Sequence, residues 1–132
     1  MRRLLRSKFS HTPLEPIAEI AQTQVDNAFL ERMSRIIEEN VANPELNVAF
    51  LAEKMGISRS SLFNKIRGLV DVTPNEMIQL VKLKKGAKLL KEGNYRISEI
   101  SYMVGFSSPS YFAKCFQKQF GVKPMDFVAA ES

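Results

Sequence analysis

The sequence has no tryptophan, one cysteine (Cys115) and one histidine (His11) among its 132 residues. A single cysteine excludes an internal disulfide, and with one histidine a zinc site built from this chain alone is not expected. No apolar run approaches the roughly 18 residues of a membrane span, and no cleavable signal pattern is present. We therefore expect a cytoplasmic location, with no metal and no cofactor.

Residues that could support catalysis are equally scarce. His11 falls in a stretch without helical periodicity, where an exposed bystander is a better interpretation than a general base. Cys115 has no activating group nearby in the sequence, and its helical position suits a small core residue. Gly-rich phosphate loops, paired acid motifs and metal-ligand spacings are absent. We expect neither an enzyme nor a small-molecule site in this domain.

Charge is distributed unevenly along the chain, which carries a formal net charge of +5. Residues 1–8 carry +4, residues 9–46 carry −5, residues 47–124 carry +8 and the last eight residues carry −2. The large positive charge of residues 47–124 thus coincides with the part of the chain where the helical pattern is densest, which favours a polyanionic partner. A solvated, lysine-rich surface would explain the same charge equally well.

Apolar residues recur at helical spacing, and no stretch alternates with period two for long enough to form a strand. The spacing predicts an all-α fold of about seven helices, near residues 26–41, 48–55, 59–70, 74–91, 97–104, 109–120 and from Pro124 onward. Residues 1–25 have no sustained period and contain two prolines, which is typical of a linker or tail following another domain.

The ends of two helices carry recognisable signals. Asp26 is a suitable N-cap for the first helix, and Asn43-Pro44 predicts its end. "TPNE", starting at Thr73, matches a capping box, and Gly93 is a suitable terminator. The helix between them would be about 27 Å long. Its apolar row is expected to contain Leu80, Leu83, Ala87 and Leu90, with Lys82, Lys85 and Lys88 roughly opposite.

A pattern occurs twice, in "NVAFLAEKMGISRSSLFNKIRGLVDVTP" and in "RISEISYMVGFSSPSYFAKCFQKQFGVKP". The two copies align at an offset of 49 through the triplets Gly56-Ile57-Ser58 and Gly105-Phe106-Ser107, and at an offset of 50 beyond them. In each triplet, glycine can adopt a positive φ, the apolar residue can be buried, and serine can cap the next helix. Each copy therefore predicts a helix-turn-helix unit. We expect one at residues 26–73 and one at 93–132, joined by a connecting helix at 74–92.

The second helix of each unit should present a polar face to solvent. Leu62, Ile66 and Leu69 are expected to face the core in the first copy, as are Phe112, Cys115 and Phe116 in the second. Small, amide and basic side chains on the outward faces are the types that read base edges and hold phosphates. The candidate DNA-binding residues are Arg59, Ser60, Phe63, Asn64, Arg67, Ser108, Ser110, Ala113, Lys114, Gln117 and Lys118.

The doubled pattern, with "VGFSSPSYFAKCFQKQFG" followed by "GVKPMDFV", resembles the DNA-binding domain of AraC-type transcription regulators over about residues 27–128. The resemblance implies that both recognition helices enter successive major-groove segments of double-stranded DNA and regulate transcription. Two positions depart from the family pattern. Asn64 replaces a usually basic residue, and Asp71 stands where glycine is common.

The basic N-terminal stretch is similar to the segment that follows the receiver in hybrid two-component regulators. That similarity implies that this domain is the C-terminal output module of a chain with a receiver and a sensor kinase, anchored in the membrane by its sensor. The alternative function is a helical protein-interaction module that docks on RNA polymerase or on a partner regulator.

Overall fold

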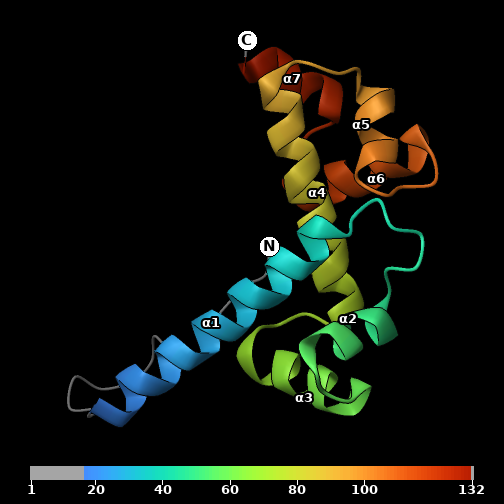
Figure 1. Ribbon diagram of the computed structural model, residues 1–132. Coiled ribbons are helices and arrows are strands. Elements are labelled where there is room, and N and C mark those ends of the chain that lie inside the picture. The colour runs from blue at the N-terminus through green and yellow to red at the C-terminus, as the bar shows by residue number, and fades with distance from the viewer. Residues whose placement is uncertain (1–16, 132) are drawn as a thin grey trace.

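The computed structural model describes residues 17–131, which form seven helices and no strand (Figure 1). The all-α prediction is confirmed. The helices are α1 (Ile17–Glu39), α2 (Val48–Met55), α3 (Arg59–Leu69), α4 (Pro74–Glu92), α5 (Ile97–Met103), α6 (Pro109–Phe120) and α7 (Pro124–Glu131). The basic stretch at residues 1–8, and His11, lie outside the described residues. No described helix is both long enough and apolar enough to cross a membrane.

Helix α1 differs from the prediction at both ends. It begins at Ile17, so Asp26 lies inside the helix rather than at its N-cap, and only 2% of Asp26 is exposed. The helix ends at Glu39, before Asn43-Pro44, and the Asn40 side chain donates to the carbonyl of Ile36 at 2.7 Å. The second half of the helix contributes to the core, where Met33 and Ile37 are fully buried.

The apolar residues gather in two separate clusters, one on each half of α4. The first is centred on Met33, Ile37, Leu51, Leu62 and Ile66, and includes Met77 and Ile78 from the start of α4. The second contains Leu83 and Leu90 from the rest of α4, together with Ile100, Val104, Phe106, Phe112 and Phe116. Each helix-turn-helix unit therefore has its own core, and α4 contributes to both.

Helix α4 starts with the predicted capping box. The Thr73 side chain accepts from the Glu76 amide at 3.1 Å, and the Glu76 carboxylate accepts from the Thr73 amide at 2.9 Å. Gly93 ends the helix in the left-handed conformation, with φ 71°. At 19 residues, the helix is about 29 Å long.

The faces of α4 are less sharply divided than the spacing predicted. Leu80 and Ala87, from the predicted apolar row, are only half-buried. Lys82 is not on a free outer face, because its side chain is half-buried and its ammonium donates to the carbonyl of Gly105 at 3.5 Å. Burial lowers the pKa of Lys82 below its usual value of 10.5. Helix α4 thus contacts other elements on several sides, as a helix between two cores must.

Candidate nucleic-acid interface

The first turn has the geometry that its sequence predicts. Gly56 caps α2 with φ 76°, and the Ile57 amide donates to the carbonyl of Ala52. Ser58 caps α3 by accepting from the Ser61 amide at 3.1 Å. Ile57 is half-buried rather than fully buried, and packs against the first cluster. The turn stops α2 and starts α3 within three residues, so α3 takes a new direction.

From its glycine to its cap, the second turn is one residue longer than the first, and the prediction for its cap was wrong. Gly105 has φ 87°, and Phe106 is buried at 5% exposure. The cap of α6 is Ser108, not Ser107: the Ser108 hydroxyl accepts from the Tyr111 amide at 3.1 Å. The inserted residue therefore lengthens the turn ahead of the cap. Ser108 is half-buried, and its hydroxyl is engaged in capping α6.

Helix α3 presents most of its predicted face to solvent. Leu62 and Ile66 are fully buried, and Leu69 is half-buried. The exposed residues include the five candidates Arg59, Ser60, Phe63, Asn64 and Arg67. Phe63 is 41% exposed, and the Arg67 guanidinium lies over its ring, 5.4 Å from the centroid. This cation–π contact holds Arg67 against the helix surface and explains how a phenylalanine is accommodated there.

Helix α6 shows the same division at equivalent positions. Phe112 and Phe116 are fully buried, as their counterparts Leu62 and Ile66 are. Cys115, predicted in the core, is only half-buried, and its sulfur lies 3.3 Å from the Gln79 side-chain nitrogen. Ala113 is also half-buried, so it lies at the edge of the outward face. The exposed candidates are Ser110, Lys114, Gln117 and Lys118.

Tyr111 is a further residue at this face that sequence reasoning did not assign. Its ring is 49% exposed, and it lies 5.8 Å from the Phe106 ring. The tyrosine follows Ser110 directly, and Lys114 is one helical turn further along. Its position in the second recognition motif, directly after Ser110, is the signal that could have found it.

The ends of the two recognition helices reflect the departure at Asp71. Helix α6 ends with Gly121 in the left-handed conformation, φ 83°. Helix α3 ends instead at Val70 in an extended conformation, φ −136°, which any residue can adopt. Because no positive φ is needed there, aspartate is tolerated after Val70. The departure at Asp71 therefore accompanies a different end of α3.

Comparison with known proteins places this geometry in a family. A family model described as a helix-turn-helix domain matches residues 51–130. The transcriptional activator AggR of Escherichia coli is 31% identical over 100 residues, which are 76% of this chain and 37% of that protein. The structure of a Chromobacterium violaceum regulator with an AraC-type DNA-binding domain matches with a TM-score of 0.75 at 23% identity, over 85% of this chain and 96% of that one.

The chain belongs to the AraC-type helix-turn-helix family. It is a DNA-binding domain of transcription regulation, and its family is not one of enzymes. The protein called histidine kinase P4 of Formosa agariphila is 42% identical over 126 residues, which are 96% of this chain and 9% of that protein. The chain thus spans 9% of the length of the Formosa agariphila protein and 37% of the length of AggR.

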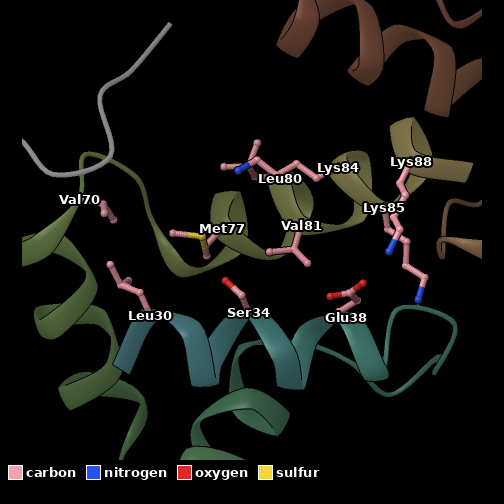
Figure 2. Close-up of a pocket in the computed structure, with 10 residues that line it drawn as sticks. All are labelled: Leu30, Ser34, Glu38, Val70, Met77, Leu80, Val81, Lys84, Lys85 and Lys88. Carbon is pink, nitrogen blue, oxygen red and sulfur yellow. The ribbon is translucent and has the colours of Figure 1, made fainter. Parts of the chain in front are cut away.

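Outside the two turns, this AraC-type domain has an open groove between α1 and α4, with a volume of about 350 Å³. Figure 2 shows Leu30 and Ser34 of α1 facing Met77 and Val81 of α4 across it. At its other end, Lys85 and Lys88 extend toward the part of α1 that carries Glu38. Helix α1 leaves α4 on the side away from α5 and α6 (Figure 1). The groove is therefore a surface distinct from the recognition helix of the second unit.

Proposed function

We propose that α3 and α6 are recognition helices that enter successive major-groove segments of one DNA duplex. The observation that carries this proposal is the match between the two helices. Leu62 and Phe112, and likewise Ile66 and Phe116, are fully buried at equivalent positions. The equivalent outward pairs, Ser60 with Ser110, Asn64 with Lys114 and Arg67 with Gln117, are all exposed. A repeated polar face on a fixed apolar support suits repeated contact with a periodic ligand.

Each candidate has a role that follows from its chemistry. Asn64 can pair with adenine in the major groove, whereas Lys114 can reach guanine or a phosphate. Ser60 and Ser110 are small enough to let the helix approach the bases, and Ala113 can contact a thymine methyl group. Basic groups at the margin hold the backbone and position the protein without reading sequence. In this proposal the phosphate contacts come from Arg59, Arg67, Gln117 and Lys118, with Phe63 supporting Arg67 and Ser108 capping α6.

The proposal also places the domain in a larger protein. The proposed units span residues 26–73 and 93–132, and residues 1–25 are the proposed linker, of which the part from Ile17 onward belongs to α1. Similarity to a protein named as a histidine kinase supports an output module fused to a receiver and a sensor kinase. The domain would work in the cytoplasm, attached to a membrane-anchored sensor.

The salt dependence of DNA binding tests the main proposal. If about five to eight phosphates are neutralised, the log–log slope of affinity against salt should be about −4.5 to −7. Fluorescence anisotropy with duplexes enriched from a random pool, at several salt concentrations, would measure it. Arg67→Ala should weaken binding to all duplexes, whereas Asn64→Ala should change the preferred sequence. A slope near zero would contradict a DNA-binding interface.

The groove between α1 and α4 favours a second function, docking of a protein partner. Its lining is apolar where Leu30 faces Met77 and Val81, and it also includes Lys84, Lys85 and Lys88 together with one acidic residue, Glu38. An acidic segment with apolar side chains would be complementary to this surface. The basic N-terminal stretch of this chain has the wrong charge to be the occupant. RNA polymerase, which a transcription activator must recruit, is the partner that we propose.

Charge reversal in the groove would separate docking from DNA binding. The double variant Lys84→Glu, Lys88→Glu should bind the enriched DNA as tightly as the unmodified protein, but should lose activation of transcription by purified polymerase. Lys91→Glu, on the same helix but outside the groove lining, is the matched control and should keep both activities. Equal loss of DNA affinity and activation in the double variant would instead assign the lysines to DNA.

A further inference from the structure

A backbone contact joins the two helix-turn-helix units at a point other than α4. Val41, just beyond the end of α1, belongs to the first apolar cluster. Gly105, in the second turn, directly precedes Phe106 of the second cluster. A Cβ atom added to Gly105 would overlap the backbone carbonyl oxygen of Val41. The turn of the second unit thus lies directly on the exit of α1.

Lys82 of α4 also contacts Gly105 at this point. Its ammonium donates to the carbonyl of Gly105 at 3.5 Å, and its Cε would lie 3.3 Å from the added Cβ. The lowered pKa of Lys82 agrees with a group that has lost part of its hydration here. Three segments distant in sequence therefore meet at one junction, which we define as Val41, Lys82 and Gly105.

The first turn shows that a helix-turn-helix turn does not itself require such close contact between its glycine and another segment. Gly56 has nearly the same conformation as Gly105, with φ 76° against 87°. A Cβ added to Gly56 would have no atom within 4 Å. Positive φ therefore explains glycine at both positions, but only Gly105 is also needed for close approach to another unit.

We propose that this junction fixes the orientation of α6 relative to α3, and so determines the half-site spacing that the domain accepts on DNA. A single helix joined at its ends can bend and twist, and each unit could shift slightly about α4. A second contact between the units removes that freedom, because the turn that aims α6 is held against the first unit. The effect on half-site spacing (the spacing role) rests on the proposed function, whereas the effect on the orientation of α6 (the orientation role) does not.

The orientation role can be measured without DNA. Spin labels would be placed on cysteines at the exposed positions 60 and 110 (Ser60→Cys, Ser110→Cys) in a Cys115→Ser background. Pulsed electron spin resonance then gives the distribution of distances between them. Gly105→Ala should shift or broaden this distribution, and Gly56→Ala, which introduces the same backbone strain without the overlap, should leave it unchanged. Lys82→Met, compared with Lys84→Met, provides a milder variant that retains the glycine. Unchanged distributions in both Gly105→Ala and Lys82→Met would overturn the proposal.

The spacing role needs duplexes that carry both half-sites with one base pair added or removed between them. If Gly105→Ala leaves a tenth of the molecules in the binding orientation, affinity for the preferred spacing falls about ten-fold. Gly105→Ala should also discriminate less between the spacings, whereas Gly56→Ala should discriminate as well as the unmodified protein. If the unmodified protein binds no duplex, the proposed function fails. If it discriminates spacings and Gly105→Ala does so equally well, only the spacing role is overturned.

Discussion

Replacing Phe112 with alanine is expected to lower the free energy of unfolding by about 3–5 kcal/mol, the usual cost of removing a buried aromatic ring. Phe112 is fully buried, and its ring lies 5.3 Å from that of Phe106 and 5.6 Å from that of Phe116. Gly86 of α4 packs on the same ring, since a Cβ added there would lie 2.9 Å from it. Urea denaturation followed by circular dichroism would measure the loss.

Phe63→Ala is the matched control, because it removes the same ring from an exposed position of the equivalent helix. Its effect on the free energy of unfolding should stay within about 0.5 kcal/mol. DNA affinity should fall, because Arg67 loses the ring that supports it. Because the two apolar clusters are separate, hydrogen exchange in Phe112→Ala should increase first around α5 and α6. A loss for Phe112→Ala no larger than for Phe63→Ala would contradict the described core.

The second large effect is expected on DNA binding, from Ser60→Glu and Ser110→Glu. Each serine is the second residue of its helix and is exposed. A carboxylate there would face the DNA, and a like-charge contact costs several kcal/mol. A cost of about 2.8 kcal/mol corresponds to about a 100-fold loss of affinity. Acidic residues are favourable in the first turn of a helix, so folding should not suffer.

Ala130→Glu adds the same charge at an exposed position of α7 and serves as the control. Anisotropy titrations at one salt concentration would compare the three variants, with thermal denaturation to confirm that they are folded. If Ser60→Glu reduced affinity and Ser110→Glu did not, only the first unit would contact DNA. If neither reduced it more than Ala130→Glu, the outward faces would not be the interface.

Most helix boundaries could be predicted from the sequence because burial and capping leave local signals. The range 109–120 for α6 and the start of α4 at Pro74 are confirmed, since Pro74 and the Thr73 cap act within one turn. The start of α1 was missed for a physical reason. The apolar period reports burial rather than helix formation, and Val25, in the missed part, is 56% exposed.

Features that depend on contacts between distant segments could not be predicted. The cap of α6 is an exception, because Pro109 favours the first helical position and so marks Ser108, rather than Ser107, as the cap. Lys82 was predicted opposite the apolar row because the residues near it in the sequence give no sign that it contacts Gly105. The junction at Val41 and the groove between α1 and α4 likewise exist only once the helices have packed. The candidate interface, in contrast, could be listed in advance because a repeated motif marks equivalent faces.

Methylation interference on a duplex enriched from a random pool would show whether both recognition helices bind in the major groove. Methylation of guanine N7 blocks the major groove, which is where both recognition helices are proposed to bind. We expect two zones of interference on one face of the duplex, centred about 10 base pairs apart, with Ser60→Glu and Ser110→Glu each weakening one of them. A single zone, or interference confined to the minor groove, would contradict this proposal.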